Sequence, residues 1–195
     1  MQTIDFVELK NGVFPVIDNF YTAEELTEIK RELYSLYEIT KLGIHANDSV
    51  SLDKDKNPRQ KSSSLFLDDL YKDKRNLSKI LNLNRKLFNE DLLKKLINRS
   101  MIYSYLESCN VDYTLINFYK TDDYYNEHVD EFCLTALTFF ELEKFYGGEL
   151  YFPEHNVTIE AVDNRVVVFP GFMLHAAKKV TQGVRVSMAQ FLRYS

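Results

Sequence analysis

The stretch VVVFPGFMLHAAKKVTQGVR, residues 166–185, decides the fold. It opens with a run of β-branched residues that ends at the Pro170-Gly171 turn, and a second β-rich segment begins after Gly183. Short apolar runs bounded by Gly and Pro are typical of β-sandwiches and barrels. Two candidate functional residues lie within this stretch: His175 directly follows one expected strand, and Arg185 lies inside the next one. We therefore expect a β-rich C-terminal half that carries the functional site.

The same pattern extends through the whole of this half. Turn signals separate short β-rich runs, which occupy residues 113–119, 133–142, 149–152, 157–161, 165–169 and 184–192. With an early run at 13–17 they make about seven strands, in an order that predicts a sandwich or jelly roll.

The first 110 residues follow a helical period instead. Thr22-Ala23-Glu24-Glu25 matches a capping box, and apolar residues at helical spacing extend the predicted helix to about Tyr37. Similar spacing predicts a shorter helix near 68–81 and a long one over 84–107. Residues 43–64 are polar and have no period, so they are either a solvated loop or a lid over the site, near His128.

Length and charge limit the possible classes. The 195 residues favour a single domain, 1–195, in which 1–110 give mainly helical support and 111–195 form the catalytic core. Residues 111–195 carry 7 Lys/Arg against 12 Asp/Glu, which accounts for the net charge of −5 and argues against a nucleic-acid partner. No apolar run is long enough to span a membrane, and no signal peptide is visible. Two cysteines without metal-ligand spacing favour the cytoplasm, and no pattern indicates an oligomeric state.

A metal site is indicated by His128-Val129-Asp130. The triplet alone is a weak signal, but it lies between two β-rich runs, where alternation points both side chains to one face. His175, 47 residues further on, offers a second imidazole. Two His and one carboxylate form the facial triad of non-haem Fe(II) oxygenases, which leaves positions on the metal open.

Arg185 adds a second, independent signal. Alternation along VRVSMAQFL places Arg185, Ser187 and Ala189 on one face, which would otherwise be core. Arginine is almost never fully buried without a partner, so an anion such as the far carboxylate of a keto acid would satisfy it. The alternative is an arginine on an edge strand that faces water.

Taken in order, YYNEHVD (124–130), GGELYF (147–152) and residues 166–185 resemble the prolyl 4-hydroxylase-like branch of the 2-oxoglutarate- and Fe(II)-dependent oxygenases. The resemblance covers about residues 113–193 and implies an α+β, mainly β fold. Its core would be a double-stranded β-helix (jelly roll) buttressed by the N-terminal helices. The iron ligands implied by the resemblance are His128, Asp130 and His175.

The resemblance also implies cosubstrate contacts. Arg185 matches the residue that binds the C5 carboxylate of 2-oxoglutarate, and Tyr119 matches a tyrosine near the metal. Asn117 and Ser187 match the N-x-Y and R-x-S patterns of more distant relatives, although an ordinary hydrogen-bonding role remains equally open for both. Many prolyl hydroxylases have a tyrosine where this chain has Phe139, so another donor, such as Ser187 or Thr138, would have to complete the carboxylate clamp.

The implied reaction is hydroxylation of a C–H bond, coupled to decarboxylation of 2-oxoglutarate to succinate and CO₂. It would need Fe(II), 2-oxoglutarate and O₂, with ascorbate as a possible stimulant. The expected substrate is a prolyl residue in a peptide or protein. A free amino acid, another small molecule and a non-catalytic jelly-roll binding module are the alternatives.

Overall fold

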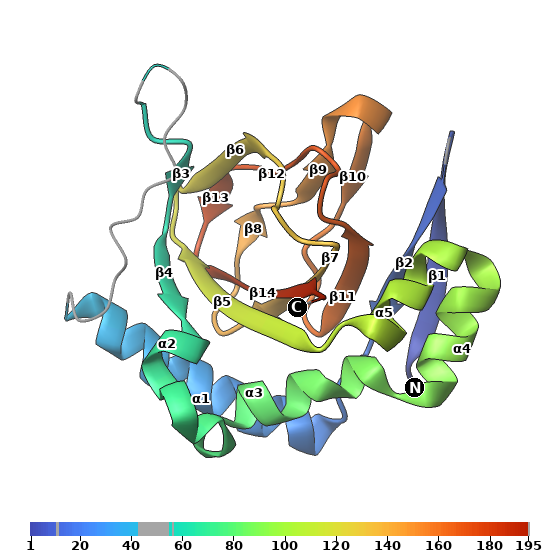
Figure 1. Ribbon diagram of the computed structural model, residues 1–195. Coiled ribbons are helices and arrows are strands. Elements are labelled where there is room, and N and C mark those ends of the chain that lie inside the picture. The colour runs from blue at the N-terminus through green and yellow to red at the C-terminus, as the bar shows by residue number, and fades with distance from the viewer. Residues whose placement is uncertain (11, 43–54, 56, 195) are drawn as a thin grey trace.

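The computed structural model describes residues 1–10, 12–42, 55 and 57–194 of the chain. Two larger antiparallel sheets face one another and form the expected double-stranded β-helix (Figure 1). The major sheet has the order β1-β2-β11-β7-β14-β5-β4 and the minor sheet β10-β9-β12-β6-β3, while β8 and β13 form a separate pair. The strands of the major sheet, in chain order, are β1 Thr3–Leu9, β2 Gly12–Asp18, β4 Ser63–Phe66, β5 Val111–Tyr119, β7 Leu134–Glu141, β11 Arg165–Pro170 and β14 Arg185–Arg193. The others are β3 Gln60–Lys61, β6 Tyr124–His128, β8 Tyr146–Gly147, β9 Leu150–Phe152, β10 Val157–Ile159, β12 His175–Ala177 and β13 Val180–Gln182.

The centre of the major sheet is buried on both faces. Strand β14 pairs with β5 on one side and β7 on the other, so that Ser187 lies between Asn117 and Phe139. Because side chains alternate along a strand, one set from β14 points toward the minor sheet and the other toward the helices. Nearly every residue of β14 is buried, which agrees with a strand covered on both sides.

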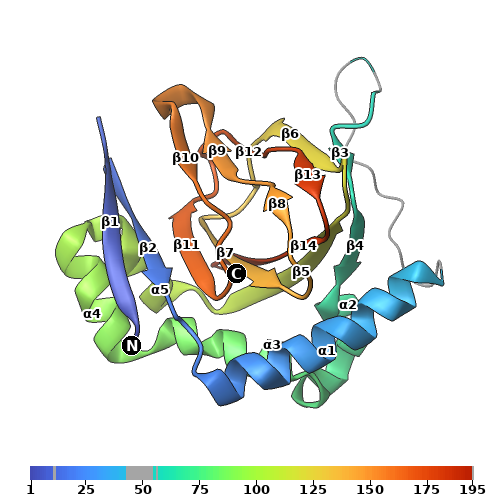
Figure 2. The same cartoon turned by 180° about the vertical axis from the view of Figure 1, so that it is seen from behind.

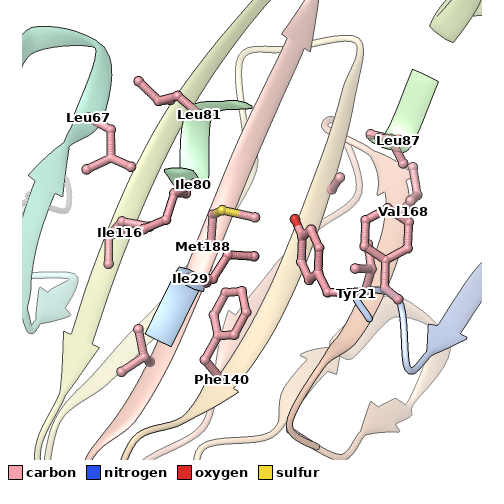
Figure 3. Close-up of a cluster of buried hydrophobic side chains, with 14 of the residues drawn as sticks. Tyr21, Ile29, Leu67, Ile80, Leu81, Leu87, Ile116, Phe140, Val168 and Met188 are labelled. Carbon is pink, nitrogen blue, oxygen red and sulfur yellow. The ribbon is translucent and has the colours of Figure 1, made fainter. Parts of the chain in front are cut away.

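The helices cover the outer face of the major sheet (Figures 1 and 2). Figure 3 shows the resulting core, in which Ile29 of α1 and Ile80 of α3 lie against Ile116, Met188 and Phe140 of the sheet. Burial of such side chains contributes about 1.5–3 kcal/mol each. The helices are α1 Ala23–Lys41, α2 Leu67–Tyr71, α3 Lys79–Leu83, α4 Glu90–Arg99 and α5 Tyr105–Ser108, and the 3₁₀ turns are η1 Lys72–Leu77, η2 Asn84–Phe88, η3 Met101–Ser104 and η4 Pro153–His155.

The capping box at Thr22 and Glu25 is present, as the sequence predicts: Thr22 accepts from the amide of Glu25, whose carboxylate accepts from the amide of Thr22. The predictions of one continuous helix near 68–81 and another over 84–107 are wrong, because each region contains several shorter helical elements. The expected helix over 84–107 is broken because Asn89 caps α4 and Ser100 is extended, with φ −156°. The one near 68–81 is broken at Lys72, which has φ 43°.

The polar segment 43–64 is not a loop throughout. Its C-terminal end forms β3 and the start of β4, whereas residues 43–54 and 56 lie outside the described residues. In the part of the chain that the structure describes, no helix has the length and apolar character needed to cross a bilayer.

Candidate active site

A cavity of about 250 Å³ lies between the two sheets. The inward-facing residues of β4, β5, β7 and β14 form one wall, and residues of β6, β9 and β12 form the other. The cavity contains every site residue that the sequence singles out: Asn117, Tyr119, His128, Asp130, His175, Arg185 and Ser187.

Three potential metal ligands meet on the minor-sheet side. Strand β6 ends at His128 and β12 begins at His175, and these two residues are directly paired in the sheet. Asp130 follows β6, where its backbone N–H donates to Gly171 O at 2.8 Å. The Asp130 carboxylate lies 3.8 Å from His128 Nε2 and 3.7 Å from His175 Nε2. One ligand atom from each residue lies within 4.8 Å of the others, so the three side chains can bind a single ion.

The backbone fixes which nitrogen each histidine offers. His128 Nδ1 lies 2.8 Å from Asn126 O, and His175 Nδ1 lies 2.8 Å from Met173 O. Because a carbonyl can only accept, each Nδ1 must carry the proton and each Nε2 presents its lone pair to the centre. The Tyr125 ring also stacks on His128, with 3.5 Å between ring centroids. Orientation of imidazoles through the second nitrogen is typical of metal sites.

The protonation states agree with this arrangement. Burial, together with neighbouring His175, lowers the pKa of His128 to about 3, so its imidazole is neutral at physiological pH. Burial raises the pKa of Asp130, which His175 and a 2.6 Å hydrogen bond from Thr135 oppose. Two imidazoles and one carboxylate are the donor set that a non-haem Fe(II) ion takes.

Arg185 lines the same cavity and is completely buried, with 0% of its surface exposed. None of its three guanidinium nitrogens makes a hydrogen bond with the described chain. Its guanidinium carbon is 4.8 Å from the Tyr119 ring centroid and 5.0 Å from that of Phe139. Burial lowers the pKa of Arg185, but an arginine stays charged in proteins. The structure thus excludes the water-facing edge position and presents an unpaired cation to the cavity.

Gly148 of the GGEL motif makes room for this arginine. It has φ +73°, and a Cβ built on it would lie 2.5 Å from Cδ of Arg185. The glycine therefore lets the backbone approach the arginine stem, in a conformation that other residues adopt at a cost.

Ser187 and Asn117 form the next row along the inner face of the sheet, beside Phe139. Ser187 has no hydrogen bond within the described residues, and it lines the cavity. Thr138 is the outward neighbour of Phe139 and pairs with Met188 of the helix-facing core. It therefore points away from the cavity and cannot replace the missing tyrosine hydroxyl.

Two cavity residues were not predicted from the sequence. Gln60 of β3 and Ser64 of β4 both hydrogen-bond to Asn117 Oδ1, at 2.9 and 2.6 Å. They lie in the polar stretch without a hydrophobic period, so no sequence signal for a strand marks them. Strand β3 pairs with β6, because Gln60 is opposite Tyr125 and Lys61 is opposite Tyr124. The described end of the predicted lid segment therefore lies beside the triad.

The remaining wall of the cavity is apolar. Rings of Phe132 and Phe191 stack with 4.7 Å between centroids, and Phe66 packs on Tyr113 at 4.8 Å. With the neighbouring aliphatic side chains they form a surface that suits an apolar group.

Comparison with known proteins agrees with this site. Residues 114–193 match the family model of the 2OG-Fe(II) oxygenase superfamily. No sequence among the curated proteins matches the chain. Among solved structures, the chain is similar to a Pseudomonas putida prolyl-4-hydroxylase, with a TM-score of 0.60, 14% identity, and 93% of this chain and 92% of that chain covered.

Two further structures share the fold. The viral collagen prolyl hydroxylase of Paramecium bursaria Chlorella virus-1, solved with 2OG, has a TM-score of 0.57 and 16% identity, with 93% and 96% covered. A Trichoplax adhaerens prolyl hydroxylase, solved with a peptide fragment of the hypoxia-inducible factor oxygen degradation domain, has a TM-score of 0.66 and 18% identity, with 94% and 84% covered.

The strand-rich part of the chain, residues 114–193, is similar to the 2OG-Fe(II) oxygenase superfamily, and the fold and the cavity agree with that similarity. Across nearly the whole chain the fold is similar to that of these three structures described as prolyl hydroxylases, which agrees with the resemblance seen in the sequence. Similarity to this family implies Fe(II) as the metal cofactor and 2-oxoglutarate and O₂ as cosubstrates.

Proposed function

We propose that this protein hydroxylates a prolyl residue of a peptide or protein. His128, Asp130 and His175 would hold the Fe(II), and Arg185 would bind the far carboxylate of 2-oxoglutarate. One observation carries the proposal: a single cavity holds a preoriented triad and, separately, a fully buried arginine without a hydrogen-bond partner among the described residues.

Different residues would bind the metal and the cosubstrate. Bound Fe(II) supplies the activation of O₂ through its open positions. The two Nε2 lone pairs and the Asp130 carboxylate fix the ion at one end of the cavity. Arg185 fixes the cosubstrate through a charge-assisted, two-pronged hydrogen bond, which is strong where water is excluded. The buried Tyr119 hydroxyl group, whose pKa burial raises to about 12, stays protonated and donates to the same ligand.

The aromatic wall supports a prolyl substrate. A proline ring is apolar and has no N–H to satisfy, so it fits a surface made of Phe66, Phe132 and Phe191 better than a polar side chain does. The three similar structures are all described as prolyl hydroxylases, and one of them is described with a peptide. A free amino acid would bring two charged groups to this wall.

The experiment is succinate release from 2-oxoglutarate with Fe(II), ascorbate and a peptide panel, followed by mass spectrometry. We expect peptides with an accessible proline to raise succinate release and to gain one oxygen atom on that proline. Matched peptides with alanine in its place are the control. Equal turnover with both sets, or oxygen gained only by free amino acids, would refute the prolyl substrate but leave the oxygenase class in place.

The cytoplasmic location, the stimulation by ascorbate and the lid formed by residues 43–64 remain predictions.

A further inference from the structure

The most informative feature that the proposed function does not use is a small network of hydrogen bonds on the wall of the cavity. Gln60 Nε2 donates to Asn117 Oδ1 at 2.9 Å, and the Ser64 hydroxyl donates to the same oxygen at 2.6 Å. Gln60 Nε2 also contacts Ser62 Oγ, at 2.5 Å. The network joins β3 and β4 to the inner face of β5.

Its effect on Asn117 follows from the atoms involved. An asparagine amide can turn over, because its oxygen and nitrogen ends have nearly the same shape. Here two donors meet one end, so the stable orientation places Oδ1 toward Gln60 and Ser64. The NH₂ group is then left to face the cavity, although Asn117 is only 4% exposed.

The neighbours of this NH₂ group are donors as well. Ser187 lies directly opposite Asn117, and Arg185 lies one row further along the same face. A guanidinium, a hydroxyl and an amide NH₂ thus lie on one face of the sheet, and the three buried guanidinium nitrogens have no hydrogen-bond partner among the residues described. Buried donors are rarely left unpaired, so a cluster of them indicates an acceptor-rich ligand such as a carboxylate.

We propose that Gln60 and Ser64 are positioning residues for cosubstrate binding. They orient the amide of Asn117 so that its NH₂ group joins Arg185 in binding the far carboxylate of 2-oxoglutarate, from the β5 side of β14, opposite to Phe139 on β7. This inference rests on the proposed role of Arg185. It adds that β3 and the start of β4, which form the C-terminal end of the predicted lid segment 43–64, help to set the affinity for the cosubstrate.

The test is calorimetric titration of 2-oxoglutarate into the Fe(II)-loaded protein without oxygen. Gln60→Met keeps the size of the side chain but removes the donor, and Ser64→Ala removes the second donor. We expect each to weaken binding about threefold to tenfold, the effect of one hydrogen bond to a ligand. Gln190→Ala is the matched control, because Gln190 is a buried amide on the outward face of the same sheet, bonded to Asp112. It should lower the melting temperature and leave the dissociation constant unchanged.

Two comparisons separate positioning from a general loss of structure. In an Asn117→Ala background, adding Gln60→Met should cause no further loss, because Gln60 acts through Asn117. Binding of 2-oxopentanoate, which has a methyl group in place of the far carboxylate, should be the same for wild type and Gln60→Met.

The outcomes are distinct. If wild type does not bind 2-oxoglutarate, the proposed function itself fails. If wild type binds it and the Gln60 and Ser64 variants bind it equally well, only the positioning role is overturned. Additive losses in the Asn117→Ala background would also overturn that role.

Discussion

Replacing Arg185 by methionine should stabilise the fold while it abolishes tight cosubstrate binding. Arg185 is fully buried and its guanidinium has no hydrogen bond to the described chain. A buried polar group left unpaired costs about 1–3 kcal/mol, and a guanidinium has several such groups. The rings of Tyr119 and Phe139 return up to about 2 kcal/mol, and water that enters the cavity returns part of the rest.

The net expectation is a gain of about 1–3 kcal/mol in the free energy of unfolding for Arg185→Met, in the range measured when buried ions are replaced by apolar residues. For a chain of this length that is a rise in Tm of about 3–9 °C. The assay is calorimetric unfolding with and without 2-oxoglutarate. A ligand at about 100 times its Kd adds about 2.7 kcal/mol, which wild type should gain and the variant should not.

The difference in free energy of unfolding between Arg185→Met and wild type should therefore become smaller or change sign when 2-oxoglutarate is added. A variant that is less stable than wild type without cosubstrate, yet gains as much stability from it, would refute the reasoning. Such a result would mean that Arg185 is a satisfied core residue and that the carboxylate binds elsewhere.

Three further expectations follow from the site and its surroundings. Asp130→Ala should abolish Fe(II)-dependent succinate release with an unchanged far-ultraviolet circular dichroism spectrum; retained turnover would remove this residue from the triad. Gly148→Ala should raise the KM for 2-oxoglutarate severalfold, since its Cβ would displace the buried guanidinium, whereas Gly12→Ala, which meets nothing within 4 Å, should leave KM unchanged; equal effects would contradict the close approach. The ion pair between Asp18 and Arg165 lowers the pKa of the Asp18 carboxyl below the ordinary 3.8, so the stability that the pair contributes above that pH is lost as the carboxylate is protonated. Asp18→Asn should therefore lower the free energy of unfolding by roughly 1 kcal/mol near neutral pH and make its fall in acid shallower. Urea titrations that show the same fall in acid for wild type and variant would count against the pair.

Half of the described strands were predictable, because turn residues bound each of their β-rich runs; these strands are β2, β5, β7, β9, β10, β11 and β14. The strands β6 and β12, in contrast, are five and three residues long, and pairing across the sheet defines them. The long helix expected over 84–107 failed for a local reason. Asn89 caps a new helix by accepting from the amides of Asp91 and Leu92, although apolar spacing continues across the break.

The site likewise contains residues that the sequence predicted and residues that it did not. His128, Asp130, His175 and Arg185 are chemically distinctive, and motif order was enough to bring them together. Gln60 and Ser64 are ordinary polar residues in a polar stretch, and only tertiary contact with Asn117 places them at the cavity. Orientation of the imidazoles through Asn126 O and Met173 O is likewise set by the backbone, which a sequence pattern does not encode.

The pairing of β14 on both sides restricts how this strand can diverge. From Arg185 to Phe191 the chain alternates between residues that face the cavity and residues that pack on the helices. Removal or insertion of one residue would exchange the two sets, placing Val186 in the cavity and the arginine charge in the helical core. The strand can therefore diverge by point replacement but not by single-residue changes in length. Variation in length should instead accumulate in the turns, such as the one between β9 and β10, where no register has to be kept.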